Sequence, residues 1–305
     1  MPPRHEIRAR RFRIGTTTTG AGMERVLVAG ASGQLGRHVV DELRRRGYRV
    51  RALSRRPERM AGRADEAVRG DLLDPASLPA ACEGVDVVFS CAGASMDLND
   101  PRDRRGPLEV DWRGNRGLLN AARAAGVRRF AYVSVFGGEM MRHLEYTDAH
   151  ERFVDDLVVS GVEHTIIRPT GFFSFFGEMV KMARRGRGIV IGSGEARTNP
   201  IHEADLARVC ANAVAGGARE VAVGGPESLT REEIVLAAFR ALGRPPRLTR
   251  LPPGFFRAAA VVARPLNRRL AALLAFGAEV SQADCVAPAH GTRRLEDYFR
   301  TLADD

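Results

Sequence analysis

The sequence predicts an α/β fold in which a doubly wound parallel sheet carries a small C-terminal lobe. Two observations support this prediction. Between residues 25 and 167, short apolar runs alternate with amphipathic helical patterns, which is typical of parallel strands covered by helices on both faces. The first apolar run also leads into glycines at positions 30, 33 and 36, and a helical pattern follows at once.

The expected elements follow from the apolar periodicity and from residues that begin or end helices. Buried strands are expected at 25–29, 48–53, 66–68, 86–90, 129–135 and 164–167. Helices are expected at 34–46, 115–125 and 149–160, and another is expected to open at Asp74-Pro75. Gly47 and Gly126 stand where two of these helices would end. The pattern loosens after Pro169, so helices are expected to mix with short strands beyond it.

The three glycines have distinct roles in a strand-to-helix turn. Gly30 permits the tight turn, Gly33 lets backbone approach a ligand without a Cβ in the way, and Gly36 lets the helix pack close to the strand. The N-terminus of such a helix binds a pyrophosphate through its free N–H groups. The sequence therefore predicts a Rossmann NAD(P)-binding domain at 24–169, followed at 170–305 by a mixed substrate lobe with segments that return to the first domain.

The residues after the second strand indicate which dinucleotide is bound. An NAD-specific site usually has Asp or Glu there, which binds the ribose 2′-hydroxyl. This chain instead has Ser54, Arg55 and Arg56, whose hydroxyl and guanidinium groups suit a 2′-phosphate. Arg37 is a second candidate, although surface arginines are ordinary in so arginine-rich a chain. We therefore expect NADP(H) rather than NAD(H).

Two further segments stand where other parts of the dinucleotide would pass. Asp71 follows the third strand, where an acid either accepts a hydrogen bond from the adenine amino group or caps a turn, and the sequence favours neither. After the fourth strand, residues 91–94 read Cys-Ala-Gly-Ala. Their small size lets backbone pass close to a ribose or a nicotinamide.

Ser134, Tyr146 and His150 form the candidate catalytic group. Ser134 follows the fifth strand, and the other two lie one helical turn apart where a helix is expected to begin. Serine and tyrosine hydroxyls near the nicotinamide can hold a substrate oxygen, and the tyrosine can donate a proton as hydride arrives. His150 can hold the nicotinamide ribose. The alternatives are a packing role for Tyr146 and a solvent-exposed helix end for His150.

The composition is that of a globular protein, with 44% hydrophobic and 28% charged residues. The four cysteines form no ligand cluster, so we expect free thiols, a reducing cytoplasmic setting and no metal. The net charge of +10 comes almost entirely from arginine, with Lys181 the single lysine. These arginines are spread along the chain without a recognition motif, so no dedicated nucleic-acid role is expected.

Both ends of the chain leave alternatives open. Residues 1–23 are rich in arginine and threonine and lack an apolar secretory core, which predicts a disordered basic extension. A transit peptide and a start at Met23 are the alternatives. The apolar stretch 254–277 contains arginines and Pro265, so it is not expected to span a bilayer. We expect a helix pair packed on the lobe, and the alternative is an amphipathic helix on a membrane surface.

The lobe carries three further signals. Four phenylalanines crowd 172–176, too many for one core stripe, so some are expected to line an apolar pocket or a lid. Glycines around 189–191 would let a loop move over the site. His202 is expected to make a structural hydrogen bond rather than act as a base. No Walker lysine and no G-x-S-x-G elbow occur, which argues against kinase and hydrolase functions.

Together these motifs resemble the extended and atypical short-chain dehydrogenase/reductase superfamily. The glycine motif, Gly70-Asp71, Ser134, Tyr146 and the helix near His150 match it in order and spacing. The segments 168–173 and 199–207 look like the branch that includes NmrA-like and divinyl-chlorophyllide-reductase-like proteins. The resemblance implies that the cofactor contacts are Gly30, Ser32, Gly33, Gln34, Leu35, Arg55, Asp71, Leu72, Ala92, Gly93, Pro169, Thr170 and Phe172, to which the reasoning above adds Gly36, Ser54 and Arg56.

The chain departs from this superfamily at His150, where the family has a lysine. A histidine is charged only part of the time near neutral pH, so it is a weaker partner for the tyrosine. The expected function is an NADP(H)-dependent oxidoreductase that transfers hydride to or from a carbonyl or an activated C=C bond of an apolar small molecule. The alternatives are an NmrA-like NADP(H)-binding redox sensor without turnover and an epimerase with a tightly held cofactor. A monomer or homodimer is expected.

Overall fold

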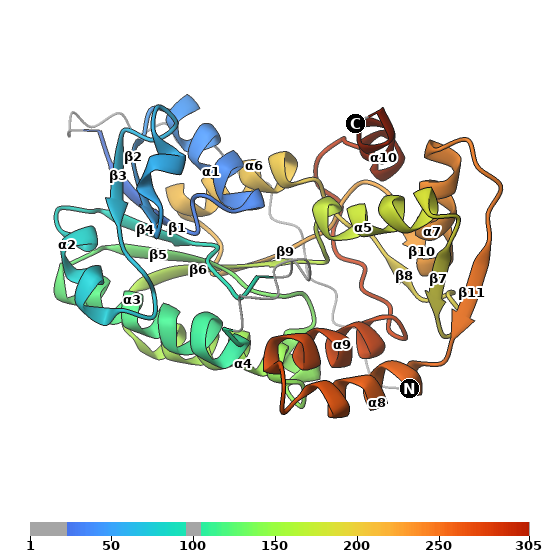
Figure 1. The fold of residues 1–305 in the computed structure, drawn as a ribbon. Helices are drawn as coiled ribbons and strands as arrows, with labels where there is room; N and C mark the ends of the chain where they lie inside the picture. Colours follow the sequence, from blue (N-terminus) through green and yellow to red (C-terminus); the bar gives the residue numbers. More distant parts are fainter. Residues whose placement is uncertain (1–22, 96–104, 305) are drawn as a thin grey trace, which may run out of the picture.

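The computed structural model describes residues 23–95 and 105–304 of the chain. Apart from Met23, the expected basic extension lies outside the described residues. A seven-stranded sheet with strand order β3-β2-β1-β4-β5-β6-β9 forms the centre, and all of its neighbours pair in parallel (Figure 1). Its strands are β1 (Arg25–Ala29), β2 (Arg49–Ser54), β3 (Glu66–Arg69), β4 (Val87–Ser90), β5 (Arg129–Val133), β6 (Glu163–Pro169) and β9 (Glu220–Val223). The predicted doubly wound fold is thereby confirmed, and the order reverses between β1 and β4, where such folds bind ligands.

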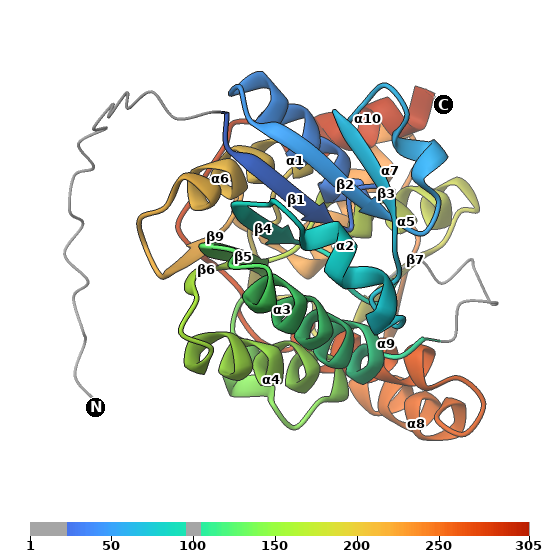
Figure 2. The ribbon, with the colours of Figure 1, turned by 90° about the vertical axis from the view of Figure 1, so that its left-hand side faces the viewer.

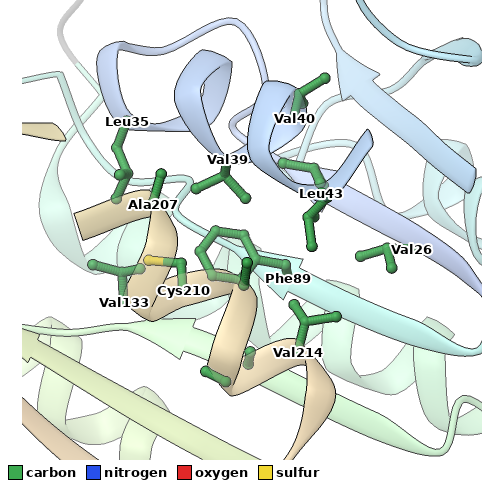
Figure 3. Close-up of a cluster of buried hydrophobic side chains, with 14 of the residues drawn as sticks. Val26, Leu35, Val39, Val40, Leu43, Phe89, Val133, Ala207, Cys210 and Val214 are labelled. Carbon is green, nitrogen blue, oxygen red and sulfur yellow. The ribbon is translucent and has the colours of Figure 1, made fainter. Parts of the chain in front are cut away.

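Helices cover both faces of this sheet, as Figure 2 shows. One face carries α1 (Gln34–Arg45) and α6 (Glu203–Ala215), and the other carries α2 (Leu78–Cys82), α3 (Asn115–Ala124) and α4 (Glu145–Val159). On the α1 side, Val26, Val39, Phe89 and Cys210 meet in the interior with almost no exposed surface (Figure 3). Alternate residues of β1, such as Leu27, face the second layer.

Element boundaries differ from the expected ones mainly where tertiary contacts extend an element. β6 continues to Pro169 because β9 pairs with it from Ile166 to Pro169. α4 begins at Glu145 rather than at residue 149, with Glu145 and Asp148 in its first turn, where acids favour the helix dipole. The helix expected at Pro75 starts as a 3-10 turn, η2 (Pro75–Ser77), before α2. Three other short helical segments are η1 (Pro57–Met60), η3 (Leu108–Gly114) and η4 (Gly138–Met141).

The lobe has a core of its own. It is built from β7 (Gly188–Ile191), β8 (Arg197–Thr198), β10 (Leu229–Thr230), β11 (Leu248–Leu251), α5 (Phe173–Arg184), α7 (Arg231–Ala241) and α10 (Leu295–Asp304). Phe173 and Phe176 are buried in this core with Phe239 and Phe299. Half of the phenylalanine cluster is therefore structural, while Phe172 is half-buried and Phe175 is exposed.

Two buried polar side chains, Asn199 and Asp205, bind the segment 199–205 to backbone groups that come later in the chain. The Asn199 amide donates to the carbonyls of Gly225 at 3.1 Å and Ala287 at 2.8 Å, and its oxygen accepts from the Ala287 N–H. Asp205 accepts from the N–H groups of Thr292 and Arg293, both at 3.1 Å. His202 caps α6 by accepting from the Ala204 N–H, which is the structural role expected of it.

The apolar stretch near the C-terminus forms a helix pair, α8 (Pro253–Ala263) and α9 (Arg268–Val280). The pair does not pack on the lobe core as expected. Instead α9 lies against α4, where Arg268 pairs with Glu145 at 3.4 Å and the Phe276 ring packs on Tyr146 at 4.7 Å between centroids (Figure 1). Among the described helices, none combines the length and apolar character that a membrane crossing needs.

Candidate functional site

The turn between β1 and α1 has the close contacts that the glycine motif predicts. Gly30 has a φ of +82°, and a Cβ there would lie 2.8 Å from the Ala92 nitrogen. At Gly36, a Cβ would lie only 2.0 Å from the Gly30 carbonyl oxygen. The absence of both side chains therefore lets α1 pack against the turn and lets the turn pack against the segment after β4.

The N-terminus of α1 suits a pyrophosphate. Gly33 is the N-cap residue, contributes no side-chain cap, and is exposed, and the first turn contains no acid. The first N–H groups of α1 and its positive dipole end therefore remain available to an anion. Around them, Ser32 is half-buried, Gln34 is exposed and Leu35 is buried.

The carboxyl end of β2 lies beside this turn, since Ala29 pairs with Leu53 in register. Ser54 is buried, and its hydroxyl accepts a hydrogen bond from the Arg56 N–H at 3.1 Å. Arg55 and Arg56 are both exposed. The two guanidinium groups thus lie just after β2, the position from which a 2′-phosphate is expected to be bound. The Ser54 hydroxyl is already hydrogen-bonded to the backbone of Arg56.

Asp71 caps a turn, which was one of the two roles left open for it. Its Oδ1 accepts from the Leu73 N–H at 3.0 Å, and its Oδ2 lies 3.9 Å from Arg105. Leu72 is buried in the apolar layer beneath α3. An adenine contact by either residue remains a prediction.

A buried polar cluster lies behind the segment that follows β4. Asp111, on the π-helical segment η3, is 1% exposed and accepts a hydrogen bond from the Ala94 N–H at 3.1 Å. Its Oδ1 lies 3.3 Å from His150 Nε2, and His150 Nδ1 lies 2.7 Å from the hydroxyl of the fully buried Tyr132. A Cβ at Gly93 would collide with the Asp111 carboxylate. We refer to Asp111, His150 and Tyr132 as the buried cluster.

Burial controls the charges in the buried cluster. Desolvation raises the pKa of Asp111 to about 7 and lowers the pKa of His150 to about 3. His150 is therefore neutral near pH 7 rather than a partial cation. Its contact with the nicotinamide ribose remains a prediction. Desolvation, with a smaller contribution from the charge of Asp111, raises the pKa of the neighbouring Tyr146 hydroxyl above its ordinary value. The ring centroids of Tyr146 and His150 are 5.0 Å apart.

Ser134 lies in a different set of contacts from the one expected. It is 3% exposed, and its hydroxyl donates to Glu151 Oε1 at 3.3 Å. Glu151 forms a buried ion pair with Arg168 at 2.5 Å, and Arg168 also pairs with Glu220 at 2.7 Å. Ser134 is thus bound to an ion pair that joins α4, β6 and β9. Its contact with a substrate oxygen remains a prediction.

The remaining predicted contacts lie at the end of β6. Pro169 is buried, and the Thr170 hydroxyl donates to the Asn199 carbonyl at 2.6 Å. Phe172 forms a parallel bridge with Ile201 and packs on the α1 side of the sheet. These residues follow parallel strands of one sheet, so they share its carboxyl edge with the glycine turn.

Sequence reasoning missed Asp111 and Asn115, whose side chains bind the backbone of the segment after β4. Asp111 sits between Val110 and Trp112, and a carboxylate flanked by apolar residues was the available signal. Asn115 accepts a hydrogen bond from the buried Ser90 hydroxyl at 2.5 Å and donates one to the Ala92 carbonyl at 3.0 Å. No local pattern connects residues 90 and 115, since their contact depends on the tertiary fold.

Comparisons with known proteins agree with this geometry. A family described as NAD(P)H-binding matches residues 30–216 of the chain. The chloroplastic divinyl chlorophyllide a 8-vinyl-reductase of Zea mays is 33% identical over 251 residues, which cover 74% of this chain and 61% of that protein. The (4-alkanoyl-5-oxo-2,5-dihydrofuran-3-yl)methyl phosphate reductase of Streptomyces griseus is 33% identical over 232 residues, which cover 74% of this chain and 77% of that protein. The match thus spans less than two thirds of the maize relative.

Solved structures with the same fold include reductases. An NADPH-dependent quinone oxidoreductase from Escherichia coli, complexed with NADPH, has a TM-score of 0.69 at 20% identity, over 91% of this chain and 99% of that chain. The triphenylmethane reductase of Citrobacter sp. has a TM-score of 0.72 at 17% identity, over 92% of this chain and 100% of that chain. At such identities the comparison establishes the shared fold.

The contact between Gly36 and the Gly30 carbonyl leads to a first prediction. Gly36→Ala forces α1 away from the turn, which should lower the free energy of unfolding by about 2–3 kcal/mol and weaken NADPH binding. Gly277→Ala is the matched control, because a Cβ there meets open space in α9 and should add up to about 1 kcal/mol of stability. Urea denaturation and calorimetric titration measure both quantities. Equal unfolding free energies and equal NADPH affinities in the two variants would contradict the close contact between Gly36 and the Gly30 carbonyl.

The buried carboxyl of Asp111 leads to a second prediction. Its pKa in the folded protein, about 7, lies above the ordinary value of 3.8, so the native state holds this proton more tightly than the unfolded chain does. The contribution of Asp111 to stability should therefore fall as the pH rises from about 4 to about 7. The lowered pKa of His150 acts in the opposite direction between about pH 3 and 6.5, so the Asp111 contribution is measured as the difference between two variants that both keep His150. Asp111→Asn lacks this proton, so its stability relative to the wild type should increase over that window by an amount on the order of 3 kcal/mol. Urea midpoints across the window test this, and parallel curves would refute it.

Proposed function

Because this chain belongs to the NAD(P)H-binding protein family, we propose that it is a reductase that uses NADPH to reduce an activated C=C bond or a carbonyl of an apolar small molecule. The observation that carries the proposal is the combination of the glycine turn with the buried cluster directly behind the segment after β4. The first holds the dinucleotide, and the second holds the segment beside which its reactive ring would lie.

The preference for NADPH rests on the end of β2. Arg55 and Arg56 follow Ser54 there, and no carboxylate is present to accept from a ribose 2′-hydroxyl or to repel a phosphate. Guanidinium groups bind phosphate through paired, charge-assisted hydrogen bonds. Both side chains are exposed, so their guanidinium groups are accessible from solvent at the end of β2.

The electrostatics around Tyr146 favour reduction of an activated C=C bond over reduction of a simple ketone. Bound NADPH supplies a hydride. When hydride reaches a ketone carbon, charge collects on one oxygen, and a nearby acid must neutralise it. Here the pKa of Tyr146 is raised and His150 is neutral, so Tyr146 is a weak acid. Asp111 is buried, and its carboxyl is engaged with the Ala94 N–H and faces His150. A conjugated acceptor spreads the charge over its own atoms and can take its proton from water afterwards.

An apolar substrate fits the side chains next to Tyr146. The Phe276 ring of α9 packs on Tyr146 at 4.7 Å, and its neighbours Leu273 and Leu274 are half-buried. Phe172 and Phe175 contribute further apolar surface at the start of α5. Such surfaces bind a flat, conjugated molecule through burial of apolar area rather than through ion pairs.

A second candidate function is redox sensing by NADPH binding without turnover. The observation in its favour is that Tyr146 is a weak acid with little support from its neighbours. Ser134 is engaged with Glu151, and the neutral His150 stands where the superfamily that the sequence resembles has a lysine. The two functions differ in one measurable respect. A reductase oxidises NADPH when a suitable acceptor is present, and a sensor does not.

Cofactor selectivity gives the third prediction. Arg55→Ala should weaken NADPH binding by about 10- to 100-fold and leave NADH binding unchanged, because it removes a charge-assisted contact made only to the 2′-phosphate. Arg59→Ala, which removes an exposed arginine of η1, is the matched control and should bind NADPH as the wild type does. Titration calorimetry with both dinucleotides tests this. Wild-type protein that prefers NADH would exclude the proposed cofactor.

Turnover gives the fourth prediction. Oxidation of NADPH by the wild type should be detected with quinones or enones, and Tyr146→Phe should lower kcat with these acceptors by less than about tenfold. A ketone that depends on Tyr146 as its acid would instead show a loss of about 100-fold or more. Tyr298→Phe, a half-buried ring on α10, is the control and should leave kcat unchanged. Tight NADPH binding with no oxidation by any acceptor class would favour the sensor.

A further inference from the structure

The outer helix of the C-terminal pair exposes a cluster of large apolar side chains. In and just after α8, Phe255 is 57% exposed, Val261 73%, Val262 71% and Leu266 75%. Within α8 only Ala260 is buried. Single exposed apolar residues are common on protein surfaces, but several within three helical turns indicate a surface that meets a partner.

The position of α8 leaves this cluster accessible. Figures 1 and 2 both show α8 at the rim of the molecule, with α9 between it and α4. Its contacts are mainly with α9, so one side of the helix is packed and the other faces outward. Phe255, Val261, Val262 and Leu266, which we call the α8 face, therefore have no covering element among the described residues.

The chain around the α8 face is positively charged. From residue 234 to residue 278 there is no Asp or Glu. The same stretch contains arginines at positions 240, 244, 247, 250, 257, 264, 268 and 269. Four of these pair with acids, namely Arg240 with Glu296, Arg250 with Glu232, Arg257 with Glu279 and Arg268 with Glu145. Arg269 is buried. Arg264, at the end of α8, is exposed, and its guanidinium has no partner in the described part of the chain.

We propose that the α8 face docks this protein onto an anionic lipid surface. An exposed apolar helix face with arginines beside it has the chemistry of helices that lie in the plane of a membrane. The apolar side chains enter the boundary between headgroups and acyl chains, and the arginines contact lipid phosphates. The docking requires no membrane-spanning helix.

A lipid surface fits the α8 face better than a second copy of the chain does. Two copies related by a twofold axis would bring the same arginine-rich segments together, and like charges repel. A stable protein interface also buries roughly 800 Å² on each partner, more than these few side chains of one helix supply. An anionic membrane has the complementary charge and accepts a narrow apolar strip.

The docking helix is joined to the candidate site through α9. Arg269 of α9 is buried and donates to the Ser95 carbonyl at 3.2 Å, directly after the segment held by Asp111. Phe276, about two helical turns further along α9, packs on Tyr146. Docking through α8 would therefore place the apolar side of the site close to the lipid. The docking proposal goes beyond the reductase proposal and stands without it.

The test is co-sedimentation of the full chain with vesicles, without dinucleotide or substrate. One set contains phosphatidylcholine alone, and the other an equimolar mixture of phosphatidylcholine and phosphatidylglycerol. The wild type should bind the mixed vesicles more tightly, and added salt should weaken that binding. Val261→Ser with Val262→Ser should weaken it by about tenfold or more. The matched control is Val158→Ser with Val159→Ser, two exposed valines at the far end of α4, which should bind as the wild type does.

A second pair of variants tests the charges. Arg264→Gln should weaken binding to the mixed vesicles by several-fold. Arg123→Gln, from the exposed surface of α3, should not. Circular dichroism and NADPH titration verify that each variant is folded. Wild-type protein that ignores the mixed vesicles would overturn the proposal. So would a solution dimer that dissociates in the Val261→Ser/Val262→Ser variant, because a second copy would then occupy the α8 face.

Discussion

The contact of α1 with the turn after β1 is the constraint on which the site depends. The Gly30 carbonyl oxygen occupies the space that a side chain at position 36 would need. The first turn of α1 can therefore pack against this turn only with a glycine at position 36. The N-terminus of α1 therefore lies at the carboxyl edge of the sheet, where the strand order reverses between β1 and β4. The segment after β4 lies beside the glycine turn, since its Ala92 nitrogen packs on Gly30.

Behind the segment after β4, the protein uses hydrogen bonds where the superfamily that its sequence resembles has a charged lysine. Asp111 holds the Ala94 N–H, Asn115 holds the Ala92 carbonyl, and Tyr132 and His150 fill the space beneath them. The pKa of His150 is about 3 and that of Asp111 is about 7, so the carboxyl is the only member of the buried cluster whose charge changes near neutrality. The three residues of the buried cluster thus include no permanent cation that could stabilise a negative charge developing on a substrate oxygen.

The parts of the molecule that local rules determine were predictable from sequence. The strands, the glycine turn and the first helix depend on neighbouring residues, and β1 was predicted to the residue. Ser134 was placed beside Tyr146 because spacing along the chain suggested it, but the Arg168–Glu151 ion pair that binds its hydroxyl joins different elements. Distant contacts also determine the charge of His150, which local sequence cannot report because the shift comes from burial.

The contacts of Asn199 and Asp205 have a consequence for how the two parts of the chain can be separated. Asn199 binds backbone groups of residues 225 and 287, and Asp205 binds backbone groups of residues 292 and 293. Residues beyond α9 therefore contact the sheet domain as well as the lobe. A chain shortened before residue 285 would lose the partners at 287, 292 and 293 and leave polar atoms of the buried Asn199 and Asp205 side chains unsatisfied. Removal of the C-terminal segment should therefore destabilise the sheet domain as well as the lobe.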